Sequence, residues 1–406
     1  MMICVNSDLL GTRQHLVYQV NDGAEYYWSA VVPADAWVFG DYRVSRSLDV
    51  LFDLLGIEKP IIAAQPHMRS FKLLTSGNIP EIPWHQVLPP HEFKQLITRL
   101  VTGLENALVG FASTNYMETF MAKRALLTRL SRVTVDHPLL ASYIRDEENA
   151  TVRSTLKSFL PLTDSMSKPV MYNQAGTVTG RLTVSNGPQI LTLPKKYRDI
   201  MISRYPGGSI IQVDFTSLEP RVARLATGLN VENDVYLQLS RELFSSALQR
   251  KEVKIAVLCA LYGVSKRRLA SMLGRDFQAD VVIREIKDFF GIPELVKDLR
   301  NQMMVNHKIK NHFGRTIEPD KMDDNILVNH YVQSTAVDAA MLGFYHLMSM
   351  LEGLAVEPLF VIHDALVLDV SQKAMLDIQD ALVNGLDVPT MGAFPVELSV
   401  ISDARE

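Results

Sequence analysis

The stretch from Ile210 to Arg221, Ile-Ile-Gln-Val-Asp-Phe-Thr-Ser-Leu-Glu-Pro-Arg, constrains the fold of this 406-residue chain most strongly. It opens as a short apolar run, which predicts a buried strand that ends at Asp214. Glu219 then precedes Pro220, which suits the first turn of a helix because proline lacks the N–H that would be unpaired there. A carboxylate at the end of a buried strand costs free energy unless a cation neutralises it. Asp214 is therefore either a helix N-cap or a ligand of a cation.

The charge of the chain is unevenly distributed. Its length allows two or three domains, and its composition, 47% hydrophobic and 21% charged, is that of a globular protein. The net charge of −4 argues against a nonspecific binder of polyanions. Residues 241–315 nevertheless hold 15 Lys or Arg against 8 Asp or Glu, whereas residues 351–406 hold 2 against 10. This pattern is typical of a protein that binds phosphates and cations, although solvated helix faces would give similar counts.

The two cysteines, Cys4 and Cys259, give neither a disulfide framework nor a zinc-binding spacing. This usage favours a reducing compartment. The first residues lack a basic segment followed by a long apolar one, so no signal peptide is predicted. No stretch has the apolar length that would span a bilayer. We therefore expect a soluble protein of the cytoplasm with no membrane partner.

Residues 1–90 predict a small α/β domain, because short apolar runs alternate with turn residues before a helix-like segment. The apolar runs are residues 15–20, 26–32 and 36–39, followed by the helix-like 47–55 and the apolar 60–64. Residues 92–130 carry leucines at helical spacing and predict long amphipathic helices packed as an antiparallel arm. Residues 161–194 are rich in Thr, Ser, Asn, Gly and Pro, and predict an ordered loop or a set of short strands.

A second carboxylate stands in the apolar segment 359–370. His363 and Asp364 interrupt this run, which predicts two buried strands with the polar pair at the tip of their hairpin. Asp is also common in turns without any further role, so an ordinary hairpin turn would explain Asp364 equally well. If the strand of Asp214 and this hairpin are neighbours in one sheet, however, the two aspartates meet. Two aspartates suit a pair of Mg²⁺ ions, because Mg²⁺ takes few carboxylates and completes its shell with substrate phosphates.

The intervening segment predicts a helix with a basic stripe. Arg250, Lys254, Leu258 and Tyr262 follow one another at intervals of four, so they drift slowly around one side of the helix. Arg250 and Lys254 then lie one turn apart on one face, a geometry that suits a triphosphate. A solvated basic face with a buried tyrosine would have the same pattern.

Six motifs in order resemble those of family A DNA polymerases, the DNA polymerase I type, and most of all a short phage form. They are Asp214-Phe-Thr-Ser-Leu-Glu-Pro-Arg, Arg250-x-x-x-Lys254-x-x-x-x-x-x-x-Tyr262-Gly263, His363-Asp364, Thr179-Gly180-Arg181, Gly314-Arg315 and Asn329-x-x-x-Gln333-Ser-Thr. One such motif would be weak evidence, but six in order with sensible gaps, over about residues 90–406, are strong.

The resemblance implies an α+β fold with the right-hand polymerase architecture, which has an antiparallel palm sheet and helical fingers and thumb. A small N-terminal α/β domain precedes it. The implied segments are 1–90 for this domain, 91–170 for the thumb, 171–235 for the first part of the palm, 236–315 for the fingers and 316–406 for the second part of the palm.

The resemblance also implies roles for individual residues. Asp214 and Asp364 are the implied ligands of two Mg²⁺ ions, with Mn²⁺ able to substitute. Arg250 and Lys254 bind the incoming triphosphate, and Lys254 is placed to protonate the leaving pyrophosphate.

Further implied residues surround the nucleotide and the DNA. Tyr262 stacks near the nascent base pair, Leu258 faces the nucleotide, and Glu219 closes the space under the sugar 2′ carbon and so rejects ribonucleotides. The implied DNA contacts, several of them to minor-groove acceptors that all Watson–Crick pairs share, are Arg181, Arg315, Asn329, Gln333 and His363.

The chain departs from the family pattern at three positions. The family commonly has Glu after His-Asp, where Ala365 stands, so a third carboxylate is missing and slower catalysis is expected at most. Leu258 occupies a position that is usually Phe or Tyr, and Pro220 one that is usually aliphatic.

The front end lacks the signature of a 3′→5′ proofreading nuclease. The first 90 residues contain no Asp-x-Glu pair and are too few for that domain, and Asp41, Asp49 and Asp53 fit a solvated surface better than a metal site. We expect a nuclease remnant or a docking unit. The expected partners are primer–template DNA and dNTPs, then a separate exonuclease, helicase–primase or processivity factor, in the host cytoplasm if the source is a phage.

Three alternatives stay open. A single-subunit RNA polymerase shares both aspartates, the lysine and the tyrosine, but Glu219 favours deoxynucleotides. A catalytically inactive polymerase-like protein would bind only DNA or a partner, yet the residues that chemistry needs are present. A phosphohydrolase using His363 and Asp364 would need further histidine ligands at helical spacing.

Overall fold

The computed structural model describes residues 2–10, 13–20, 24–34, 36–40, 73, 88–111, 116–161, 165–173, 177–245, 247–262, 266–273 and 278–403. The chain divides into two compact units, Met1–Met117 and Glu118–Glu406. Each is described by itself. No helix in these ranges is long and apolar enough to cross a membrane.

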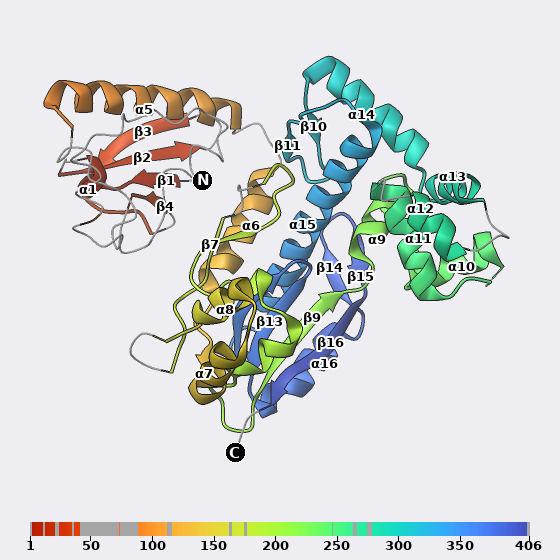
Figure 1. Cartoon of the computed structure of the whole chain (residues 1–406). Helices are drawn as coiled ribbons and strands as arrows, with labels where there is room; N and C mark the ends of the chain where they lie inside the picture. The colour runs from red at the N-terminus through yellow and green to blue at the C-terminus, as the bar shows by residue number, and fades with distance from the viewer. Residues whose placement is uncertain are drawn as a thin grey trace. The chain divides into compact units, whose positions relative to one another are not determined.

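The first unit is a four-stranded sheet with the order β3-β2-β1-β4 (Figure 1). Its elements are β1 (Met2–Val5), α1 (Ser7–Leu10), β2 (His15–Val20), β3 (Ala24–Ser29), β4 (Ala36–Phe39) and α5 (Pro90–Phe111). Strand β1 is antiparallel to β2 and parallel to β4, and Cys4 lies in its fully buried part. The predicted strands of this region are present, whereas segments 47–55 and 60–64 lie outside the described residues.

Helix α5 packs against β3 and buries Leu96 and Leu100. The expected leucine stripe is therefore real at these positions. It belongs to the first compact unit, which extends to Met117. The reason is that a sheet with an apolar face needs a covering helix, and α5 supplies it. The division of residues 91–406 into thumb, palm and fingers stays a prediction.

The second unit is built on a fully antiparallel sheet with the order β12-β13-β9-β16. Its strands are β9 (Ser209–Phe215), β12 (Val356–Ile362), β13 (Ala365–Val370) and β16 (Val396–Asp403). Strand β13 lies between two neighbours and is buried along its whole length, which explains why its sequence is apolar apart from Asp369, whose carboxylate accepts from Ser203 and Arg204. The predicted hairpin about His363 and Asp364 is confirmed, since Ile362 pairs with Ala365.

Short elements and helices surround this sheet (Figure 1). Before β9 come α6 (Tyr116–Arg129), β5 (Thr134–Val135), α7 (His137–Asp146), α8 (Ala150–Lys157), β6 (Met171–Asn173), β7 (Thr183–Asn186), the 3-10 helices η1 (Ile190–Thr192) and η2 (Lys195–Ile200), and β8 (Met201–Ile202). Segment 161–194 thus contains the β6–β7 ribbon and a 3-10 turn, in agreement with the expected short strands.

After β9 most of the described elements are helices. The elements are α9 (Leu218–Leu225), α10 (Val235–Phe244), α11 (Arg250–Tyr262), α12 (Lys266–Leu273), α13 (Ala279–Phe289), α14 (Ile292–Asn306), the strands β10 (Ile309–Lys310) and β11 (Thr316–Ile317), and α15 (Asp324–Met350). The last part adds η3 (Gln372–Ala374), α16 (Met375–Leu382), β14 (Leu386–Val388) and β15 (Gly392–Phe394).

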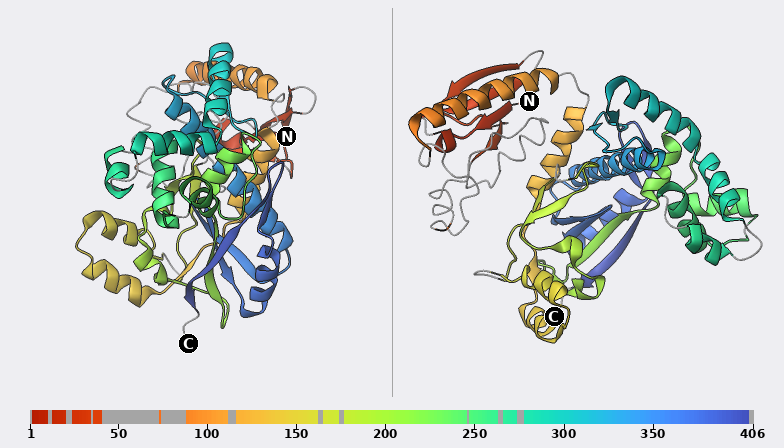
Figure 2. Two further views of the ribbon diagram at one scale, coloured as in Figure 1. Left: turned by 90° about the vertical axis from the view of Figure 1, so that its right-hand side faces the viewer. Right: turned by 45° about the horizontal axis from the view of Figure 1, so that its top comes forward.

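Helix α15 lies against the sheet (Figure 2), with the rings of Phe344 and Phe215 5.2 Å apart. Gly343 allows this approach, because a Cβ there would lie 2.8 Å from the ring of Phe215. A buried ion pair joins α15 to α6, between Lys123 and Asp338, whose side chains are 0% and 1% exposed. Asn311 also donates to Asp338, at 2.7 Å.

Candidate active site

The two aspartates predicted to act together lie at one end of adjacent strands, Asp214 one residue before the end of β9 and Asp364 in the turn just before β13. Strand β13 pairs with β9 so that Ala365 stands opposite Asp214, and the amide of Phe215 donates to the carbonyl of Asp364 at 3.2 Å. His363 has a φ of 56° in the left-handed region, which closes the β12–β13 turn tightly. The predicted neighbourhood of these strands is therefore confirmed. Asp214 does not cap the helix that follows, since Ser217 holds the N-cap position of α9.

Both carboxyl groups have raised pKa values. Burial raises the pKa of Asp214 to about 6, with the charge of Asp364 as the next cause, while a hydrogen bond from Gln212 opposes the shift. Burial likewise raises the pKa of Asp364. A bound divalent cation would remove this cost of holding two carboxylates close together.

These residues fit Mg²⁺ by their chemistry, because it takes oxygen ligands from one or two carboxylates and leaves other positions to substrate. Within the described ranges, no three His, Cys, Asp or Glu side chains are grouped closely enough to hold a metal ion by themselves.

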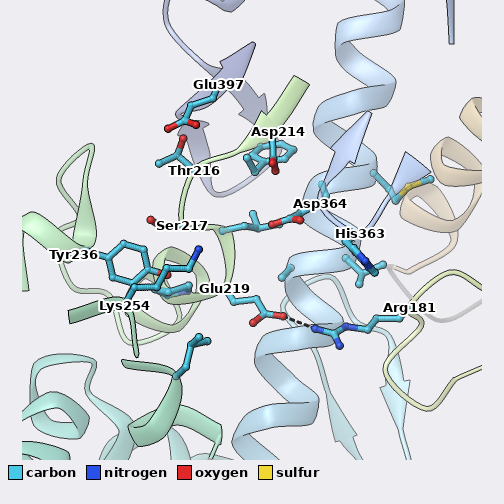
Figure 3. Close-up of a pocket in the computed structure, with 18 of the residues that line it drawn as sticks. Arg181, Asp214, Thr216, Ser217, Glu219, Tyr236, Lys254, His363, Asp364 and Glu397 are labelled. Carbon is cyan, nitrogen blue, oxygen red and sulfur yellow. Dashed lines mark hydrogen bonds and ion pairs between the residues drawn. The ribbon is translucent and has the colours of Figure 1, made fainter. Parts of the chain in front are cut away.

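A pocket opens between the sheet, α11 and α15 (Figure 3). Eight of the predicted site residues line it, from four separate parts of the chain. They are Arg181, Asp214, Glu219, Arg250, Lys254, Leu258, His363 and Asp364. Burial keeps the pKa of Asp364 raised, and the positive charge of Lys254 in the same pocket opposes that rise.

Glu219 lies at the meeting point of two contacts in the pocket wall. Arg181 donates to its Oε1 at 2.7 Å, as the dashed line in Figure 3 marks, and the hydroxyl of Tyr262 donates to its Oε2. Burial and the nearby charge of Glu219 raise the pKa of Tyr262. Tyr262 therefore takes part in the site through Glu219, although it does not line the pocket.

Helix α11 has the predicted orientation. Arg250, Lys254 and Leu258 face the pocket, whereas Val253 and Val257 are fully buried on the adjacent stripe. The sequence pattern thus gave the correct face of this helix.

The remaining candidates for DNA contacts lie outside the pocket lining. Asn329 and Gln333 are half-buried on α15, about two turns and one turn, respectively, before the lining residue Val337. The guanidinium of Arg315 packs on the turn at Gly180, where a Cβ would lie 2.2 Å from its Nη1. Gly180 is required there, because its φ of +76° is also one that side chains rarely adopt.

The family model of DNA polymerase family A matches residues 93–403, most of the chain. The chain belongs to DNA polymerase family A. It is thus a member of a family of DNA-directed DNA polymerases. The POL domain of Pol1 from M. smegmatis, solved in complex with DNA primer-template and dNTP, has a similar fold. The TM-score is 0.62 at 14% sequence identity, over 98% of this chain and 94% of that chain. The predicted right-hand architecture is confirmed, while no curated protein matches the sequence.

Sequence reasoning missed Glu397 of this family A polymerase. It stands opposite Asp214 on β16, on the other side of β9 from Ala365, and it lines the pocket. Opposite residues in an antiparallel pair project from the same face. Asp214 thus has a carboxylate neighbour on β16 where the family motif would place one on β13. The alternation in 396–400 could have revealed a strand, but not its partner.

Other missed lining residues include Thr216, Ser217 and Tyr236. Gln212 was also missed. Gln212 donates to Asp214 at 3.2 Å and accepts from Arg198 at 3.1 Å. These two hydrogen bonds link the carboxylate of Asp214 to the guanidinium of Arg198. An aspartate two residues after a glutamine on one strand shares its face, and that spacing is a usable signal.

Proposed function

We propose that this family A polymerase extends a DNA primer along a DNA template with dNTPs, by nucleotidyl transfer at two Mg²⁺ ions held by Asp214 and Asp364. The observation that carries the proposal is the position of these two carboxylates, which lie at one end of the adjacent strands β9 and β13 and line one pocket with Lys254 and Arg250. Carboxylates beside a basic helix face suit a substrate that is a metal-bound triphosphate.

Bound Mg²⁺ would activate the attacking oxygen and stabilise the leaving one. The side chains around it have separate tasks. Arg250 and Lys254 bind the negative oxygens of the triphosphate, and the amine of Lys254 gives its proton to the leaving pyrophosphate. Asp214 and Asp364 orient the reacting groups, helped by the Gln212 amide on Asp214.

Glu219 is proposed to exclude ribonucleotides. Its contacts with Arg181 and Tyr262 fix its carboxylate in the pocket wall, which supports a rigid barrier under the sugar 2′ carbon. This feature favours a DNA polymerase over a single-subunit RNA polymerase. Primer extension with dNTPs beside NTPs distinguishes the two.

The primer terminus and duplex are proposed to contact residues at the rim. His363 and Arg181 line the pocket beside the two carboxylates, while Asn329 and Gln333 continue along α15. Asn329 has a buried Oδ1 with no hydrogen-bond partner in the part of the chain that the structure describes. Such an acceptor is costly unless a ligand or water donates a hydrogen bond to it.

The test is primer extension with Mg²⁺ on wild-type protein and on Asp364→Ala. We expect the variant to lose synthesis by about 10³-fold or more, because the charge stabilisation by metals is lost, while primer–template binding survives. Asp387→Ala, at an exposed aspartate on β14, is the matched control and should extend normally. Mg²⁺ should raise the melting temperature of the wild type more than that of Asp364→Ala. Near-normal extension by Asp364→Ala would refute the metal assignment.

A further inference from the structure

The guanidinium of Arg250 is already held in place by an acidic side chain from another element. Its Nε donates to Oδ2 of Asp234 at 2.6 Å, and its guanidinium carbon lies 5.2 Å from the ring centre of Tyr236. Arg250 and Tyr236 line the pocket, whereas Asp234 is not among the lining residues. We infer that Asp234 is a positioning residue that presents Arg250 to the triphosphate of the incoming nucleotide. This inference rests on the proposed function.

Asp234 is rigid because it has a second task. It is the N-cap of α10, where its Oδ1 accepts from the amides of Tyr236 at 2.9 Å and Leu237 at 3.1 Å. A capping carboxylate cannot rotate freely without leaving two helix amides unpaired. One oxygen therefore fixes the group on α10, and the other is fixed toward Arg250, the first residue of α11.

The loop before Asp234 is in turn anchored to the helix that carries Glu219. Arg221 of α9 is only 5% exposed, and its Nη2 donates to the carbonyls of Glu232 at 2.6 Å and Asn233 at 3.2 Å. The charge of Asp234 also acts on Arg221, where it raises the pKa against the lowering effect of burial. The position of Arg250 thus depends, through Asp234 and the loop before it, on α9, the helix that carries Glu219.

This arrangement reduces the entropy that binding a nucleotide must remove. An arginine side chain has many rotamers, and ordering it at the moment of binding weakens affinity. Asp234 accepts a hydrogen bond from Nε of Arg250, and Tyr236 lies beside the guanidinium. The side chain of Arg250 is therefore ordered before the nucleotide arrives. The alternative is that Asp234 competes with phosphate for Arg250. In that case removing the charge of Asp234 would lower the KM for dNTP instead of raising it.

The experiment compares Asp234→Asn with the wild type in steady-state primer extension. Asparagine is as good an N-cap as aspartate, so α10 keeps its cap while Arg250 loses its charged partner. We expect the KM for dNTP to rise by about 10-fold, kcat to change by much less, and the dissociation constant for primer–template to stay the same. The matched control is Asp136→Asn, the same change at the N-cap of α7, which should move none of these values.

A double variant separates positioning from a general effect on folding. Arg250→Ala alone should raise the KM for dNTP, and adding Asp234→Asn should raise it no further, because Asp234 acts through Arg250. Additive effects, an unchanged KM in Asp234→Asn, or a lower KM would each overturn the inference. If the wild type itself failed to extend a primer, the proposed function would fail instead, so the two failures are distinguishable.

Discussion

At the scale of the residue, Glu219 is the side chain through which distant parts of the polymerase site meet. Arg181 comes from the loop before β7 and Tyr262 from the end of α11, and both bind the same carboxylate. A side chain held by two partners keeps one rotamer, which a steric barrier needs. The contacts thus make a definite prediction for its substitution.

Glu219→Ala should accept NTPs in place of dNTPs about 10-fold more readily than the wild type. The truncation opens space beneath the 2′ carbon and leaves Arg181 and Tyr262 without this acceptor, so dNTP use should also weaken. The measurement is the ratio of NTP to dNTP incorporation at single positions. Glu219→Gln, which keeps the size of the side chain, is the control and should retain the wild-type preference. If the ratio stays the same in Glu219→Ala, discrimination against ribose depends on another group.

A site residue can be predicted from sequence when the pattern that reveals it lies within one short segment. Asp214 and Asp364 each interrupt an apolar segment, so each can be recognised from its own segment alone. Glu397 and Tyr236 enter the pocket only through a strand pairing and a helix packing that join distant segments. A carboxylate on a half-exposed alternating strand looks like an ordinary solvated residue until its partner strand is known.

At the scale of the element, helix α11 shows how far periodicity can lead. The spacing of Arg250, Lys254 and Leu258 predicted one common face, and the structure has all three on the pocket. The same spacing could not predict that Asp234 would bind Arg250, because that contact depends on how α10 and α11 pack.

The register of α11 makes a prediction for Leu258. A tyrosine hydroxyl at this position would stand in for the 3′-hydroxyl that a dideoxynucleotide lacks, whereas leucine and phenylalanine offer no such group. Leu258→Tyr should therefore raise ddNTP incorporation by about 10-fold or more, and Leu258→Phe should not. A competition of ddNTP against dNTP on wild type and both variants measures this. Equal chain termination by the Tyr and Phe variants would mean that Leu258 does not face the sugar.

At the scale of the whole molecule, the chain divides later than the composition indicates. The prolines near residue 90 look like a domain exit, but α5 follows them and still covers the first sheet. Composition marks a change of local conformation, while a unit boundary depends on which surface a helix buries. Strand β9 and the β12–β13 hairpin were predictable as local apolar runs, whereas the antiparallel sheet with its helical fingers was implied only by the resemblance to the polymerase family.

The small size of the first unit predicts a polymerase without proofreading. With a 3′-labelled mismatched primer, Mg²⁺ and no nucleotides, the wild type should leave the label in place. The reason is that a two-metal nuclease needs several carboxylates, and residues 1–90 contain no Asp-x-Glu pair to begin one. Asp364→Ala is the control, because it removes any reversal of synthesis. Shortening of the primer that depends on Mg²⁺ and persists in Asp364→Ala would reveal a nuclease.

The buried ion pair between Lys123 and Asp338 restricts how helix α6 can move. Neither side chain is exposed to water, so withdrawing the amine would leave an isolated charge in the core, at a cost of about 3–5 kcal/mol. Rotating α6 about its own axis or sliding it by one turn would do this. The pair therefore fixes one axial setting of the helix against α15. Any movement of α6 must therefore be a tilt about a point near Lys123.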